Sequence, residues 1–119
     1  MSAWAYVAAI VACGIGAACR YWLGLARKPQ QYPWPTLAAN IVGSAVLGAA
    51  ASAVHGGAPD WVLVVFGAGL AGGITTFSAL ALDAVTLWGT GRRWSAVGYL
   101  AATLALGVGA AWLGWRVLL

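Results

Sequence analysis

The chain has 119 residues, of which 63% are hydrophobic and only 7% are charged. A water-soluble domain of this size has too little interior to hide that much apolar surface, so the composition excludes an ordinary soluble protein and predicts a membrane protein. The net charge of +4 comes from six basic residues at or near the ends of apolar segments, which indicates membrane anchoring and topology rather than nucleic-acid binding.

Four apolar segments follow one another along the chain, with short loops between them. Residues 3–26, 35–54, 61–88 and 94–116 each reach the ~20 residues that a transmembrane helix needs. The eight tryptophans lie near the ends of these segments, as in the interfacial aromatic belts of membrane proteins. We therefore expect one all-α domain over residues 1–119, built from four transmembrane helices and placed as a multi-pass protein in the cell membrane.

The third segment contains a run, Gly69 to Ser78, in which two glycines precede two threonines. Glycine disfavours the helix and threonine is only a moderate helix former, which predicts an interruption at Gly72–Gly73 near the membrane midplane. A straight helix from Trp61 to Trp88 would also exceed the ~30 Å hydrocarbon core. Opened backbone in lipid needs protein, water or an ion to pair its polar groups. The run predicts either an ion site at a broken helix or a glycine-rich packing kink.

Polar residues in the second and fourth segments share faces with small residues. Asn40 lies one helical turn before Ser44, on a face whose small residues favour close helix packing. Asn40 is therefore expected to face the bundle, either as an interhelical hydrogen-bonding group or as the lining of a pathway. Tyr99 and Thr103 share a face of the last segment. Four short helices this rich in glycine enclose little space, so a pore or carrier built from them needs a second subunit.

The usual groups of an enzyme site are not recognisable in the sequence. Asp60 is expected in a loop, Asp83 stands apart from other acids, and the single histidine, His55, belongs to no nucleophile or metal-ligand cluster. Cys13 and Cys19 point to different sides of one helix and are expected to be buried, unpaired residues. A small multidrug-type exporter is disfavoured because the first segment has no acid for proton coupling. The remaining candidates for a functional site are hydroxyl and amide groups, which can bind an anion, and freed backbone carbonyls, which can bind a cation.

The chain resembles the Fluc family of fluoride channels, also called CrcB, along almost its whole length, and three motifs carry the resemblance. They are GAACRY at 16–21, TLAANIVGS at 36–44 and GGITTFS at 72–78. The resemblance implies a passive, non-enzymatic channel that exports fluoride, built as an antiparallel dimer with two pathways. It also implies a structural Na⁺ at the dimer centre, not transported, and held by the backbone carbonyls of Gly72 and Thr75.

The same resemblance implies roles for single residues. Phe77 matches a pore phenylalanine whose electropositive ring edge faces the anion. Arg20 matches a family arginine and is expected to serve in an electropositive vestibule or as an anchor. The remaining residues expected along the fluoride pathway are Asn40, Ser78, Tyr99 and Thr103.

The chain departs from the family pattern at three positions. Leu80 stands in place of the second pore phenylalanine, Ala79 replaces a hydroxyl of the polar track, and Asp83 stands where the family usually has glutamate. An aliphatic side chain offers no aromatic edge to an anion, so one pore wall loses a ligand. Because of Leu80, the alternative to a full channel is a structural subunit that conducts through one pore or through none.

The basic residues are distributed unevenly over the two sides of the membrane. By the positive-inside rule, the side with more of them is cytoplasmic, which places both termini outside. Together with Leu80, this bias favours a heterodimer whose partner is a paralogue of opposite topology, and the alternative is a homodimer that tolerates Leu80. Arg116 lies on the poorer side, and the four residues on the richer side are Arg27, Lys28, Arg92 and Arg93.

Overall fold

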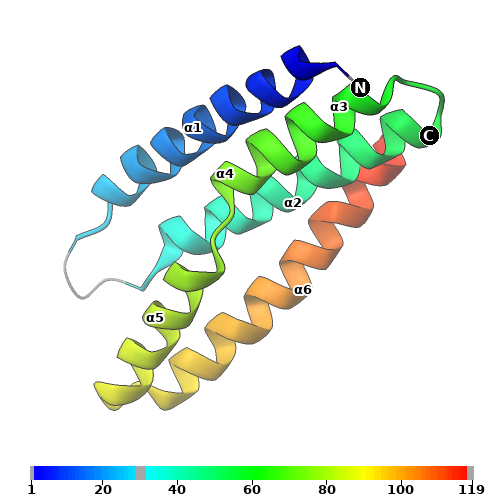
Figure 1. Cartoon of the computed structure of the whole chain (residues 1–119). Coiled ribbons are helices and arrows are strands. Elements are labelled where there is room, and N and C mark those ends of the chain that lie inside the picture. Colours follow the sequence, from blue (N-terminus) through cyan, green and yellow to red (C-terminus); the bar gives the residue numbers. More distant parts are fainter. Residues whose placement is uncertain (1, 29–31, 118–119) are drawn as a thin grey trace.

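The computed structural model describes residues 2–28 and 32–117, and within them it is entirely helical (Figure 1). Four stretches are long and apolar enough to cross a membrane, which confirms the four predicted spans with bounds shifted by about one residue. The third stretch is divided into several elements. In chain order the elements are α1 (Ala3–Leu25), α2 (Trp34–His55), α3 (Asp60–Val62), η1 (Leu63–Ala71), α4 (Gly72–Ile74), α5 (Phe77–Gly89) and α6 (Arg93–Val117).

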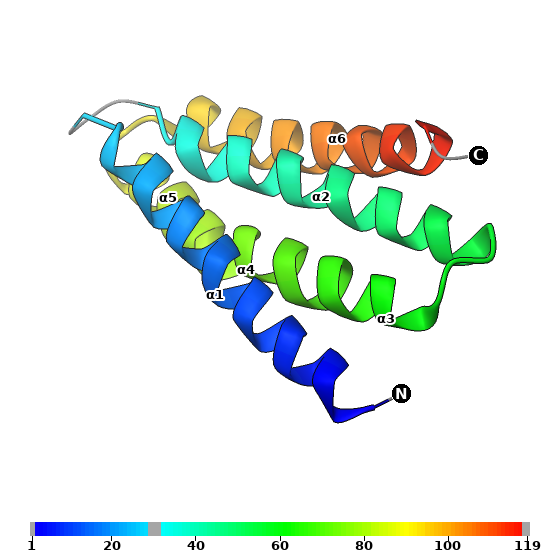
Figure 2. The ribbon, with the colours of Figure 1, turned by 90° about the horizontal axis from the view of Figure 1, so that it is seen from above.

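The helices run along the long axis of a slender bundle that measures 49 × 27 × 19 Å. Figures 1 and 2 both show the start of α1 and the end of α6 at one end of this axis, as an even number of spans requires. The α2–α3 loop lies at that same end, and the α5–α6 turn lies at the other. Gly57 and Gly91 turn these two connections with φ of +109° and +84°, backbone conformations that are strained for other residues.

Most buried residues of the bundle are small, with Tyr99 and Leu87 as large exceptions, whereas most large apolar side chains point outward. The buried residues include Ala5, Ala39 and Ala71, while Ile10 and Leu104 are 71% and 70% exposed. This distribution reverses that of a soluble protein and fits a chain whose outer surface is covered by lipid or by another subunit. Cys13 and Cys19 are exposed, so the expectation that they are buried is wrong for the single chain.

Glycines let the helices approach each other closely at several contacts, of which two are examples. A Cβ atom at Gly73 would overlap the carbonyl oxygen of Cys13, which brings α4 against α1. A Cβ atom at Gly48 would overlap the carbonyl oxygen of Ala111, which brings α2 against α6. Such contacts between small residues are a principal source of helix association where no hydrophobic driving force acts between helices.

The predicted break in the third span is confirmed, but it lies three residues after Gly72–Gly73. Both glycines are helical within α4, and the chain leaves the helix at Thr75 and Thr76, whose ψ values of 155° and 127° are extended. Before the break, η1 is a π-helix, in which the Gly72 N–H bonds to the Gly67 carbonyl, five residues back. Gly73 contributes close packing against α1, and the interruption belongs to the β-branched pair that follows.

One expectation about acidic residues needs correction, because Asp60 is the first residue of α3 rather than a loop residue. Asp83 contacts two residues of other elements: its Oδ2 accepts a hydrogen bond of 3.1 Å from the Tyr99 hydroxyl, and its Oδ1 lies 3.7 Å from Nη1 of Arg27. Asp83 therefore connects α5 to α6 and to the segment that follows α1.

Candidate functional site

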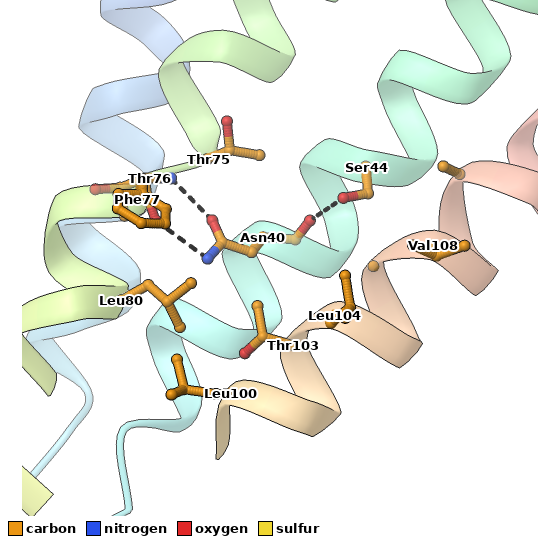
Figure 3. A pocket seen from close by; sticks show the side chains of 12 residues that line it. Asn40, Ser44, Thr75, Thr76, Phe77, Leu80, Leu100, Thr103, Leu104 and Val108 are labelled. Carbon is orange, nitrogen blue, oxygen red and sulfur yellow. Dashed lines mark hydrogen bonds between the residues drawn. The ribbon is translucent and has the colours of Figure 1, made fainter. Parts of the chain in front are cut away.

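The break in the third span is held by one side chain from α2. The Thr76 N–H donates to Oδ1 of Asn40 at 2.8 Å, and Nδ2 of Asn40 donates to the Thr76 carbonyl at 3.2 Å (Figure 3). Asn40 is only 8% exposed. Its amide therefore pairs with both the N–H and the carbonyl of Thr76, as a neighbouring main chain would, at the break in the third span.

Thr76 also begins the second half of the span. Its backbone is extended, and its Oγ1 accepts a hydrogen bond of 3.2 Å from the Ala79 N–H, which makes it the N-cap of α5. A threonine cap of this kind satisfies one of the amides that the first turn of a helix leaves unpaired. Thr75 is the C-cap of α4 and Thr76 is the N-cap of α5, so two adjacent residues end one helical segment and start the next.

The carbonyls of residues 72–75 lose their helical donors at this break, including those of Gly72 and Thr75. In a continuous helix the Thr76 and Ala79 amides would bond to the carbonyls of Gly72 and Thr75, but they donate to Asn40 and to the Thr76 hydroxyl instead. Another of these carbonyls, that of Gly73, accepts a hydrogen bond of 3.3 Å from Nε of Arg20 on α1. Arg20 therefore acts as an anchor between α1 and the break in this structure.

The carbonyl oxygens of Gly72 and Thr75 are chemically suited to a hard alkali cation. Main-chain oxygens at unwound membrane helices coordinate Na⁺ and K⁺ in other transport proteins. Gly72 is exposed on the bundle surface, so its carbonyl region is accessible to a neighbouring subunit. Within residues 2–28 and 32–117, no group of three or more His, Cys, Asp or Glu side chains offers an alternative metal site.

A groove of about 520 Å³ runs beside the break, between α2, α5 and α6. It brings together three of the predicted pathway residues, Asn40, Phe77 and Thr103, and also contains the departure at Leu80 (Figure 3). Phe77 is 81% exposed, so its ring is not held by the single chain. The other residues that line the groove are Ser44, Thr75, Thr76, Leu100, Leu104, Gly107, Val108 and Ala111.

The hydroxyl groups in this groove are bonded to their own helices. Ser44 Oγ donates to the Asn40 carbonyl at 2.7 Å, and Thr103 Oγ1 donates to the Tyr99 carbonyl at 2.8 Å. An anion that passes along the groove would have to draw these protons away from the backbone. The exchange is feasible because a hydroxyl rotates about its C–O bond and a helical carbonyl retains its main-chain donor.

The other predicted site residues lie outside this groove. Tyr99 is fully buried, its hydroxyl bonds to Asp83, and its ring meets the edge of Tyr32 at a centroid distance of 5.6 Å. Ser78 is exposed, with its Oγ 3.2 Å from Oγ1 of Thr76. Arg20 lines a second groove of about 440 Å³ between α1, α2 and α5.

Comparison with known proteins identifies the family. The family model described as CrcB-like protein, Camphor Resistance (CrcB), matches residues 7–115. This chain belongs to the CrcB family. Proteins named Fluoride-specific ion channel FluC are similar to it: one from Mesorhizobium japonicum is 42% identical over 88% of each chain, and FluC 1 from Geobacillus kaustophilus is 39% identical over 94% of this chain and 97% of its own.

A third relative, the FluC of Renibacterium salmoninarum, is 44% identical over 73% of this chain and 70% of its own length. The family resemblance read from the three motifs is therefore confirmed. With four membrane-spanning helices, this CrcB-family chain is a multi-pass protein of the cell membrane.

Sequence reasoning missed two features of this CrcB-family site. One is the double role of Thr76, which is bonded by Asn40 and caps α5. The cap could have been suggested by a threonine at the start of an apolar run. The other is the contact of Asp83 with Tyr99 and Arg27. No local signal predicts that contact, since its members come from three separate parts of the chain.

Proposed function

We propose that this chain is a subunit of a fluoride-selective channel that lets fluoride leave the cytoplasm passively. The observation that carries the proposal is the groove beside the Asn40-held break, which gathers an amide, several hydroxyls and an exposed phenylalanine in an apolar membrane bundle. The names of the similar proteins supply the ion. Hydrogen fluoride enters cells as a neutral weak acid and dissociates inside, so a pore for the trapped anion needs no energy source.

The groove is open along one side, which supports a second subunit as its missing wall. Asn40, Phe77 and Thr103 line it from α2, α5 and α6. The exposed Phe77 ring would then be fixed by the partner and present its electropositive edge to the ion. We propose an antiparallel arrangement, in which each subunit contributes to the pathways along the shared face.

The proposal includes a structural Na⁺ that is not transported. The carbonyls of Gly72 and Thr75 would hold it together with the equivalent groups of the second subunit. Its charge would pair with main-chain oxygens that the break leaves without helical donors, and so offset their desolvation. The ion would thereby stabilise the break and the dimer together.

We propose that the second subunit is a paralogue of opposite topology. Leu80 lies in the groove with Phe77, so a homodimer would have one aromatic position per pathway filled by an aliphatic side chain. The basic bias gives this chain one preferred orientation, whereas a dual-topology homodimer needs almost none. A homodimer that tolerates Leu80 is the competing arrangement.

Fluoride efflux from liposomes tests the function. Phe77→Ile should lower the efflux rate at least about tenfold, because the ring edge is lost while apolar volume is largely kept. Phe66, the other phenylalanine of the chain, lies in a separate apolar groove lined by residues of α2 and α3. Phe66→Ile is therefore the matched control and should leave efflux unchanged. Equal efflux from both variants would contradict the proposed pathway.

The same experiment separates the runner-up, a subunit that only supports its partner's pore. Leu80 favours this alternative, because it removes an aromatic group from the groove. For such a subunit, Phe77→Ile would leave efflux of the complete dimer unchanged. Deletion of the gene in its native host is an assay that does not require the partner to be known. Cells that lose a channel subunit should tolerate a lower fluoride concentration than cells that keep it.

A further inference from the structure

A separate groove lies at the α5–α6 turn, at the end of the bundle away from the first residues of α1. It has a volume of about 280 Å³ and is lined by Trp88, Arg93, Trp94 and Val97. None of these residues belongs to the groove beside the break or to the groove around Arg20. Trp88 and Trp94 are 51% and 87% exposed, so the site opens toward the lipid side of the bundle.

The guanidinium group of Arg93 is held in a defined position within this groove. Its Cζ lies 5.2 Å from the centroid of the Trp88 ring, which is the range of a cation–π contact. Stacking occupies one face of the planar group and leaves the N–H donors at its edge, in the geometry that binds two phosphate oxygens at once. An arginine fixed in this way loses less side-chain entropy on binding than a freely moving one.

The surroundings of the groove favour an anionic lipid. Four basic residues lie at this end of the bundle, Arg27, Lys28, Arg92 and Arg93, and in the described part of the chain Asp83 is the only acid near them. The positive-inside rule places this end in the cytoplasmic leaflet, which carries a negative surface potential from its anionic lipids. The indole rings of Trp88 and Trp94 prefer the headgroup level of the bilayer, where the lipid phosphates lie.

We infer that this groove binds the phosphodiester of an anionic phospholipid. Arg93 pairs with the phosphate oxygens, and the exposed Trp94 contributes an indole N–H donor at the same depth. Val97, one turn further into the membrane on α6, packs against the start of an acyl chain. The inference does not rest on the proposed fluoride function, because it uses only the geometry and charge of the α5–α6 turn.

Native mass spectrometry of the purified full-length chain, titrated with phosphatidylglycerol or phosphatidylcholine, tests the inference. Arg93→Gln should weaken phosphatidylglycerol binding about tenfold, because one charge-assisted, two-point contact is lost. Arg116→Gln is the matched control, since Arg116 stacks on Trp112 at 5.7 Å at the other end of the same helix. It should leave the affinity unchanged. The readout is taken in detergent, so it does not depend on how either variant inserts in cells.

Three results would overturn the inference. The first is equal loss of phosphatidylglycerol binding in the two arginine variants, which would indicate a general effect of net charge. The second is phosphatidylcholine binding as tight as that of phosphatidylglycerol. The third is displacement of the lipid by millimolar inorganic phosphate, which would identify the ligand as a free anion. A matching circular dichroism spectrum for all three proteins controls for folding.

Discussion

At the scale of single residues, the side chain of Asn40 makes two hydrogen bonds to the backbone of Thr76, at the point where the third span is broken. An amide is suited to this because it carries an acceptor and a donor side by side, whereas leucine carries neither and ionised aspartate carries only acceptors. Asn40 also lines the groove beside the break. The structure thus shows its hydrogen-bonding role, and its contact with a passing anion stays a prediction.

Removal of this amide should destabilise the protein. Asn40→Ala leaves the part-buried Thr76 N–H without its side-chain partner, which costs about 1–3 kcal/mol. We expect a clear fall in the thermal unfolding temperature in detergent, together with loss of fluoride efflux. Ser44→Ala is the control, because the Ser44 hydroxyl bonds only to its own helix. An Asn40→Ala protein as stable as Ser44→Ala would show that the amide does not hold the break.

Leu80 offers a prediction in the opposite direction. Leu80→Phe adds an aromatic edge in the groove that contains Phe77, and should raise fluoride efflux several-fold, in line with the ~0.5–1.5 kcal/mol of an aromatic contact. Leu104→Phe places the same ring on α6, at another position in the groove, and should give no such gain. If both variants conduct alike, the position of the ring does not matter and Leu80 is no defect.

At the scale of helices, the spans could be predicted from the sequence and the exact break could not. Hydrophobicity and the placement of tryptophans are local signals, so the predicted ends of the spans fall within about one residue of those observed. The break depends on Asn40, which lies 36 residues away from Thr76 in the chain. Glycine propensity pointed to Gly72–Gly73, but close packing against α1 keeps Gly73 helical and uses its missing side chain for contact.

The candidate site could be predicted only in part for the same reason. Asn40 and Phe77 belong to contiguous motifs, so their importance is visible in the sequence, and the groove brings them together. Tyr99 shares a helical face with Thr103, yet burial against α5 turns its hydroxyl to Asp83, 16 residues away in sequence. Side-chain partners chosen by packing between helices leave no periodic signal that a single sequence can show.

The packing role of Gly73 is testable by adding one methyl group. Gly73→Ala would place a Cβ atom against the Cys13 carbonyl, so α1 must move away from α4 at a cost of about 1–3 kcal/mol or more. Gly98→Ala is the control, because nothing lies within 4 Å of its added Cβ atom and alanine is the better helix former. Thermal unfolding should show Gly73→Ala less stable than the wild type and Gly98→Ala equal or better; the reverse order would reject the contact.

The break also predicts a dependence on Na⁺. A cation bound only by the folded protein stabilises it by about 2.7 kcal/mol when its concentration is 100 times the dissociation constant. We therefore expect purification with N-methylglucamine in place of Na⁺ to lower the unfolding temperature, and restored Na⁺ to raise it again. Asn40→Ala should respond less, since its break is no longer held in place. Equal stability of the wild type in both salts would argue against a cation at Gly72 and Thr75.

At the scale of the whole molecule, the distribution of charge favours one orientation in the membrane. Four basic residues lie in the loops after α1 and α5 and at the first position of α6, and the opposite end of the bundle carries Arg116 with the acidic Asp60. Each Lys or Arg near an anionic membrane surface contributes about 1 kcal/mol. A difference of this size supports the proposed single orientation, and an antiparallel dimer would then need a partner of the opposite orientation.

Cysteine labelling in intact cells decides between the two assemblies. In a background without Cys13 and Cys19, which are both exposed and therefore replaceable, Ala58→Cys marks the α2–α3 loop and Gly89→Cys marks the α5–α6 turn. An impermeant maleimide should label Ala58→Cys and spare Gly89→Cys, because the basic end is held in the cytoplasm. Replacing Arg92 and Arg93 by glutamine should then expose part of the Gly89→Cys population. Equal labelling of both sites without that replacement would show dual topology, and so a homodimer that tolerates Leu80.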